Sequence, residues 1–346
     1  MNRQRWIILA VFAAAVAVAT PFIGVLGQTV LVNLLLAATV ATGVALLMGF
    51  AGQVSLGQGA FFAVGALTAA LMAREGVAPF LAVVAGAAAA AALAFVVGIP
   101  LLRLRGHYLA FGTLAMQIIL LVVVNNVDLF GGPYGIQGIP LFSIFGWELR
   151  TPADYSYLAL AVLIIVLLIS QLVVDSRFGR GLRALAGSES AAQSSGISVS
   201  WYKTQVFTLT AAFAGLAGAV YPFAIGHVSG ASFPLMASFQ YVVMAVVGGM
   251  TSVWGGVIGA FAITILVQAL NGLSTAPGMP PTAPAILGYA VYAIALIAAI
   301  LLIPRGIGPT IMDAVRRRQK SPPGADSAGT VVEKEPAVSG AHAGTS

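Results

Sequence analysis

Residues 175–203 read DSRFGRGLRALAGSESAAQSSGISVSWYK, and they form the one long polar stretch that lies between strongly apolar segments. Its first part separates apolar from basic residues at helical spacing: the apolar ones are Phe178, Leu182 and Leu185, and the basic ones are Arg177, Arg180 and Arg183. Ser188 can cap a second short helix, and Gly196 can end it. The stretch therefore predicts a pair of short helices held between two membrane spans.

The rest of the chain is too apolar for a soluble domain. Its 346 residues are 60% hydrophobic and only 8% charged, with a mean hydropathy of +1.00, whereas soluble domains carry about 25% charged residues. No charged residue occurs from Trp6 to Ala73 or from Thr204 to Pro304. The chain has no cysteine, which excludes disulfides and thiolate chemistry. The composition predicts an all-α integral membrane protein.

Apolar runs of span length, about 20 residues each, predict about ten transmembrane helices. They lie at 6–26, 29–49, 57–73, 79–102, 107–125, 155–174, 205–226, 235–252, 255–272 and 284–303. A cytoplasmic N-terminus places fourteen lysines and arginines inside and only Arg74 and Arg150 outside. Because cytoplasmic loops collect positive charge, this asymmetry predicts an N-in, C-in orientation.

The same pattern divides the chain into three parts. Residues 1–5 form a cytoplasmic N-terminus, and residues 6–304 form the membrane domain, which includes the loop 175–204. Residues 305–346 form a cytoplasmic tail that we expect to be disordered from about residue 321, because Ser, Pro, Gly and Ala dominate it. Glycines near 248–256 leave room for a broken or re-entrant helix within 235–272.

Residues 49–62, GFAGQVSLGQGAFF, mix glycines with polar side chains inside an apolar region. Glycines permit close helix packing and unwound backbone, and polar side chains can satisfy the backbone groups that unwinding frees. Tight packing and a role in a translocation path both explain this pattern, and a Gln58 that faces the bundle interior would favour the path. The candidates for the path are Gln53, Ser55, Gln58, Thr113 and Gln117.

Several of these stretches resemble one family in a consistent order. The E-x-A-A-x-x-x-G-I pattern at 189–197 resembles the coupling loop of ABC-importer permeases. Residues 49–61 are similar to the G-x-A-G-x-x-S-L-G-Q-x-A-F signature of the LivH/LivM permeases, and further similar blocks lie at 104–114, 130–140, 246–255 and 302–307. The resemblance covers about residues 30 to 308 and is to the LivM-type permeases of branched-chain amino acid importers.

The resemblance implies a permease subunit of an ATP-driven importer in the bacterial plasma (inner) membrane. It implies a second, LivH-like permease chain, two ATP-binding subunits and an extracytoplasmic substrate-binding protein as partners. The chain has no G-x-x-x-x-G-K-[ST] motif, so we expect it to bind no cofactor while the ATPase subunits use ATP and Mg²⁺. The residues expected to couple to the ATPase are Arg177, Phe178, Arg180, Arg183, Glu189, Ala191, Ala192 and Gly196.

Other interpretations stay open at this point. Urea and short-chain amide importers use similar permeases, so the family leaves the substrate undecided between these and branched-chain amino acids. It also leaves undecided whether the permease core is a homodimer or a heterodimer.

An ion-coupled secondary carrier is a different class, but such carriers normally place ionisable residues inside the membrane, and the carboxylates here lie in loops, near span ends or in the tail. A membrane enzyme is a third interpretation, but this sequence shows no nucleophile–base or metal constellation. The pI near 9.8 arises from loops and tail and requires no nucleic-acid partner.

Overall fold

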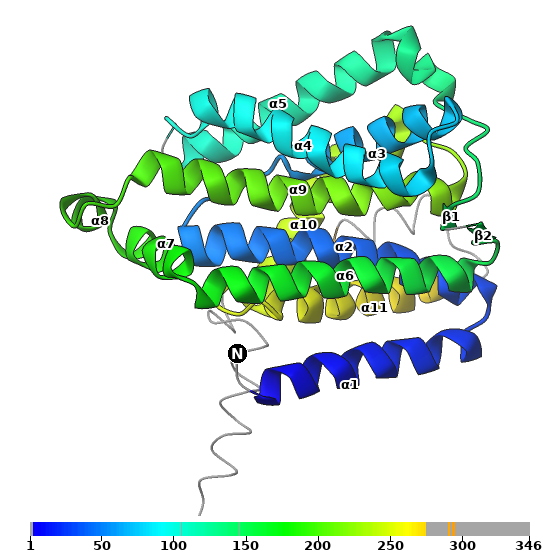
Figure 1. Ribbon diagram of the computed structural model, residues 1–346, viewed down its shortest axis with the longest axis horizontal. Helices are drawn as coiled ribbons and strands as arrows, with labels where there is room; N and C mark the ends of the chain where they lie inside the picture. The colour runs from blue at the N-terminus through cyan, green and yellow to red at the C-terminus, as the bar shows by residue number, and fades with distance from the viewer. Residues whose placement is uncertain (1–2, 105, 145, 275–289, 291–292, 295–346) are drawn as a thin grey trace, which may run out of the picture. The chain divides into compact units, whose positions relative to one another are not determined.

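Long apolar helices make up nearly all of the fold (Figure 1). The computed structural model describes residues 3–104, 106–144, 146–274, 290 and 293–294, all within a unit that covers Met1–Thr310. The helices are α1 Arg3–Ala19, α2 Val25–Ala51, α3 Gln58–Arg74, α4 Pro79–Leu101, α5 His107–Asn126, α6 Pro152–Asp175, α7 Arg177–Gly187, α8 Glu189–Ser194, α9 Val199–Ile225, α10 Leu235–Gly248 and α11 Gly255–Ser274. Short 3-10 helices are η1 Thr20–Phe22, η2 Asp128–Phe130, η3 Gly132–Tyr134 and η4 Gly230–Ser232.

Within the described residues, six segments are long and apolar enough to cross a membrane: Val25–Ala51, Pro79–Leu101, His107–Asn126, Pro152–Asp175, Val199–Ile225 and Gly230–Gly248. Three shorter apolar helices cover Trp6–Phe22, Gln58–Arg74 and Gly255–Ala269. The prediction of an all-α, multi-pass membrane protein is confirmed. It missed one two-stranded hairpin, β1 Ser143–Ile144 with β2 Trp147–Glu148.

The first nine predicted stretches each coincide with one helix, although some helix ends differ. The first helix begins at Arg3, inside the segment predicted as an N-terminal tail, and α9 begins at Val199 rather than at 205. Hydropathy placed the start of α9 too late because polar residues open this helix. The predicted tenth span, 284–303, lies almost wholly outside the described residues, as does the tail 305–346.

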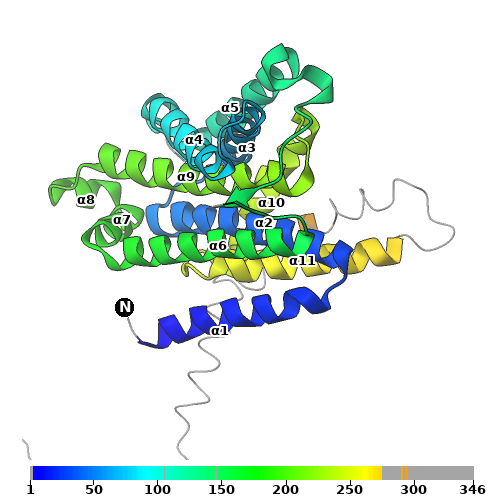
Figure 2. The same cartoon turned by 45° about the vertical axis from the view of Figure 1, so that its right-hand side comes forward.

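The two longest helices, α2 and α9, pack against each other at the centre of the fold. Helices α3 and α4 cover α9, while α6, α10 and α11 cover α2. Helix α1 contacts little of the rest and lies at one edge in both Figure 1 and Figure 2. Among the buried residues of the described chain, Lys203 is the one that carries a charge. The interior between these helices is therefore almost free of charge, although it holds buried polar side chains.

Glycines allow α3 and α9 to pack with their backbones in contact. A Cβ added to Gly65 of α3 would lie 2.1 Å from the carbonyl oxygen of Gly215, and a Cβ added to Gly218 of α9 would lie 2.0 Å from the carbonyl oxygen of Phe62. Neither separation leaves room for a side chain, because the obstructing atoms belong to the backbone. These contacts join α9 closely to α3.

The glycines near 248–256 form a tight antiparallel hairpin. Helix α10 ends at Gly248 and α11 begins at Gly255, and a Cβ on Gly248 would lie 1.7 Å from the carbonyl oxygen of Gly255. One turn farther from the hairpin end, a Cβ on Gly259 would lie 1.7 Å from the carbonyl oxygen of Met244. The helix is broken between α10 and α11, as the sequence allows, and α11 packs antiparallel to α10.

The connection between α5 and α6 is ordered by short hydrogen-bonded elements. Its Ile136 exchanges two backbone hydrogen bonds with Val228, at 2.7 and 3.1 Å, and so ties this connection to the segment after α9. The β1–β2 hairpin follows and leaves Trp147 87% exposed. The two hydrogen bonds of Ile136 thus hold this connection in place.

Candidate functional site

The chain is unwound between α2 and α3, and this break brings backbone polar groups into the bundle. Helix α2 ends at Ala51, Gly52 adopts a left-handed conformation with φ +65°, and α3 begins only at Gln58. With 27 residues α2 is about 40 Å long, whereas α3, with 17 residues, reaches only about 25 Å. The length difference fits an α3 that starts inside the bundle rather than at its end.

Contacts at the two ends of the break show how far the chain re-enters. Gly52 lies against α7, where its added Cβ would be 3.6 Å from the Cα of Ala186. Gly59 lies against Gln117, which is half-way along α5, ten residues after His107 and nine before Asn126. The break therefore runs from the α7 end of the bundle to its middle, and α3 begins there.

Side chains of α5 and α10 satisfy backbone N–H groups at the break. The amide of Leu56 donates to Thr113 Oγ1 at 2.9 Å, and the amide of Gly59 donates to Ser238 Oγ at 2.8 Å. The Ser238 hydroxyl then donates to Gln117 Oε1 at 2.5 Å. Unwound backbone in an apolar interior requires such partners. Three helices that are distant in the sequence meet at this point.

Three glutamine side chains near the break are buried, yet they keep unused hydrogen-bonding groups. Gln53, Gln58 and Gln117 are between 1% and 3% exposed. Their Nε2 atoms have no hydrogen-bond partner among the described residues, and neither has Oε1 of Gln53. We call Gln58, Gln117 and the first turn of α3 the amide site. A buried amide without partners is costly, so such a group needs an explanation.

All five predicted path residues are buried. Two of them, Thr113 and Gln117, lie on α5 and contact the break. Ser55 Oγ accepts from the amide of Gly57 at 3.4 Å, while Thr113 and Gln117 take the roles described above. Gln58 is buried in the bundle, and its role in a translocation path stays a prediction. Sequence reasoning missed Ser238, because a single serine in an apolar helix gives no signal of what it will contact.

The predicted pair of short helices is present as α7 and α8. Ser176 caps α7 by accepting from the amide of Gly179 at 3.2 Å, and Ser188 caps α8 by accepting from the amide of Ala191 at 3.3 Å. Leu182 and Leu185 of α7 are buried. The three arginines, Arg177, Arg180 and Arg183, are exposed. The predicted amphipathic character of α7 is confirmed.

An ion pair attaches α8 to α9. Lys203 Nζ of α9 donates to Glu189 Oε1 of α8, with the lysine side chain 10% exposed and the glutamate side chain 46% exposed. Ala192 lies on the buried face of α8, whereas Ala191 on the other face is exposed. Gly196 has φ +81° and ends the segment as predicted. Sequence reasoning placed Lys203 at the end of the polar stretch but gave it no partner.

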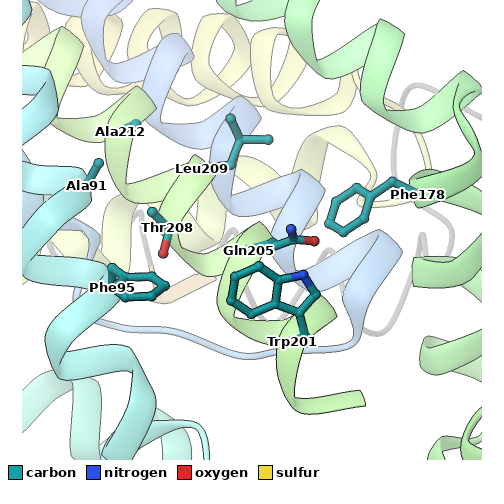
Figure 3. A pocket seen from close by; sticks show the side chains of 8 residues that line it. All are labelled: Ala91, Phe95, Phe178, Trp201, Gln205, Thr208, Leu209 and Ala212. Carbon is teal, nitrogen blue, oxygen red and sulfur yellow. The ribbon is translucent and has the colours of Figure 1, made fainter. Parts of the chain in front are cut away.

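Two cavities border this region. A polar cavity of about 1050 Å³ lies among α8, the start of α9 and the segment after α4, and Arg103, Glu189 and Lys203 line it. An open, mainly apolar groove of about 600 Å³ lies between α4, α7 and α9, and Figure 3 shows Trp201 between Phe95 and Phe178 there. The predicted coupling residue Phe178 thus faces this groove, and its ring stacks on Tyr202 with centroids 4.9 Å apart. Neither cavity includes the amide site.

Comparison with known proteins agrees with this architecture. Residues 26–301 match the family model described as "Branched-chain amino acid transport system / permease component". The chain belongs to this family. The chain is 32% identical over 289 residues to the high-affinity branched-chain amino acid transport system permease protein LivM of Escherichia coli, covering 76% of this chain and 68% of that protein.

The chain is also similar to a second LivM protein and to a permease named for another substrate. The LivM protein of Salmonella typhimurium is 30% identical over 289 residues, with the same coverage of 76% and 68%. The D-allose transport system permease protein AlsC of Escherichia coli is 29% identical over 231 residues, covering 63% of this chain and 67% of that protein. No solved structure matches this permease chain. The match extends through α2–α11, so it includes the break, the amide site and the α7–α8 pair.

Proposed function

We propose that the chain is the permease subunit of an ATP-driven importer for branched-chain amino acids in the bacterial inner membrane. It forms the translocation path together with a second, LivH-like permease chain. Two ATP-binding subunits hydrolyse ATP with Mg²⁺, and an extracytoplasmic binding protein delivers the substrate. This chain itself is a transport subunit and not an enzyme. Its substrate follows from the two LivM relatives at 30% and 32% identity, which are named for branched-chain amino acids.

The observation that carries the proposal is the α7–α8 pair. It lies between two spans in the sequence and presents exposed residues. Glu189, Ala191 and Gly196 are exposed on or next to α8, while Ala192 holds α8 against the protein. Small exposed residues permit close approach by a partner, and the arginines of α7 add positive charge beside it. We infer that the ATPase subunit docks here, which makes this face cytoplasmic. With the ten spans that the sequence predicts, both termini would then lie inside.

Movement of α8 can reach the centre of the bundle through rigid contacts. The Glu189–Lys203 pair joins α8 to α9. Backbone contacts at Gly65 and Gly218 join α9 to α3, whose first turn lies at the amide site. Packed helices shift as units rather than deform continuously. The bundle would alternate between outward and inward openings around the start of α3.

Reconstitution tests the proposal directly. The chain alone in liposomes should move no leucine under a proton gradient or a sodium gradient, because its described residues hold almost no buried charge through which ions could couple. With a second permease chain, two ATPase subunits and the binding protein, leucine uptake should require ATP on the cytoplasmic face. Gradient-driven leucine uptake by this chain alone would show that it is a secondary carrier.

A further inference from the structure

The amide site offers hydrogen-bond donors that the protein does not use. Gln117 Oε1 accepts from Ser238, and the Ser238 hydroxyl already accepts from the amide of Gly59. A hydroxyl has one proton to donate, so this chain of bonds turns the Gln117 oxygen toward α10 and leaves its nitrogen free. The nitrogen points at α3, since it lies 2.8 Å from where a Cβ of Gly59 would be.

The start of α3 adds further donors and a favourable dipole at the same place. Its N-cap is Gly57, which has no side chain to cap the first turn, and Gln58 at the first helical position has an unpartnered Nε2. The N-terminus of a helix carries a partial positive charge, and here it lies in an apolar surrounding, where that charge is weakly screened. No acidic side chain is among the buried residues of the described chain, so no buried carboxylate of the protein competes for these donors.

We propose that the amide site binds the carboxylate of the substrate as it passes through the permease. This inference rests on the proposed function and adds the chemical group that the site recognises. A carboxylate has only acceptors when ionised, and it fits a site whose free groups are N–H donors at the positive end of a helix. Neutral amides hold the anion without a fixed positive charge, so the substrate can leave again on the other side.

Glycines keep the site close to the backbone. A Cβ on Gly57 would lie 2.8 Å from the carbonyl oxygen of Thr113, and a Cβ on Gly59 would lie 2.7 Å from Ser238 Oγ. Larger residues at either position would separate α3 from α5 and α10 and remove the convergence of donors. Half of the residues of α5 are exposed, and its buried residues are Leu109, Ala110, Thr113, Gln117 and Val124. A helix held by so few buried residues can move aside to admit the ligand.

The first test is uptake by the whole importer in liposomes, with ATP and the leucine-loaded binding protein. Gln117→Leu should lower leucine uptake at least tenfold, while ATP hydrolysis stimulated by the loaded binding protein continues and shows that the importer is assembled. Gln205→Leu is the matched control, since Gln205 is an exposed glutamine of α9, and its uptake should stay within twofold. Normal uptake by Gln117→Leu would overturn the proposal.

The second test reads binding without transport. The importer in nanodiscs, without binding protein, is heated with 4-methylpentanoate or with 4-methylpentanamide, which differ only in the carboxylate. The acid should raise the unfolding midpoint and the amide should not, and the shift should vanish in Gln117→Leu but persist in Gln205→Leu. Equal shifts, or none from either probe, would overturn the carboxylate site. If the wild type imports no leucine, the proposed function fails, yet this measurement still decides the site.

Discussion

Breaking the Glu189–Lys203 pair should reveal how firmly α8 is held on α9. The two possible single changes leave different groups unpaired. Glu189→Gln leaves an ammonium group whose side chain is only 10% exposed, whereas Lys203→Met leaves a carboxylate that is 46% exposed and can be hydrated. We therefore expect Glu189→Gln to be the more damaging change, although both remove the same interaction.

The magnitude lies between two known limits. Removing one partner of a fully buried ion pair costs about 3–5 kcal/mol, and an exposed pair contributes roughly 0.2–1 kcal/mol. Because Glu189 is half-exposed and a polar cavity adjoins the pair, we expect a cost of about 2 kcal/mol for Glu189→Gln and about 1 kcal/mol for Lys203→Met. A cost of about 2 kcal/mol lowers the ratio of attached to detached α8 roughly 30-fold.

The assay compares the free energy of unfolding of the purified chain in mixed micelles with leucine uptake per ATP hydrolysed in the assembled importer. The control is Glu148→Gln, whose pair with Arg150 has side chains 48% and 74% exposed, and which should cost no more than about 0.5 kcal/mol. Exchanging the charges, with Glu189→Lys and Lys203→Glu together, should recover part of the loss. The reasoning is refuted if Lys203→Met is worse than Glu189→Gln, or if Glu189→Gln behaves like the control.

The remaining predictions concern packing, topology and docking. Gly218→Val should destabilise the chain by about 1–3 kcal/mol, since its Cβ would lie 2.0 Å from a carbonyl oxygen of α3, whereas Gly187→Ala has nothing within 4 Å and should change the unfolding free energy little. Cysteines introduced at Ser176 and Ser143 should label from opposite sides of the membrane, because the chain has no native thiol; labelling from one side would contradict the ten-span topology. Gly196→Asp should abolish uptake while the protein still reaches the membrane, because φ is +81° there; normal co-purification of the ATPase subunits would place docking elsewhere.

Much of the fold could be predicted because its signals are local. Hydropathy finds the spans, and the α7–α8 pair follows from its capping serines, Ser176 and Ser188, and from the glycine that ends it. These features depend on neighbours within a few residues, so the sequence shows them directly. The hairpin at 143–148 was missed because two-residue strands have no periodicity to detect.

The contacts that organise the candidate site depend instead on how distant helices pack. The sequence placed polar residues near the break, but it could not show that α3 begins half-way along α5, because hydropathy measures length and not depth. Ser238 and Gln117 are 121 residues apart, and only the packing of α10 beside α5 brings them together. Glu189 and Lys203 are 14 residues apart on two different helices, so helical periodicity relates neither to the other.

The scarcity of charge inside the described helices has an electrical consequence. A membrane potential does work only on charge that moves across it, about 2.3 kcal/mol per elementary charge at 100 mV. The one buried charge of the described chain, on Lys203, is paired with Glu189, so the two move together with no net charge. A zwitterionic amino acid also carries none. We expect the turnover of the reconstituted importer to stay unchanged when the membrane potential is varied. A cell whose membrane has depolarised would then still import the substrate at the rate that its ATP supply allows.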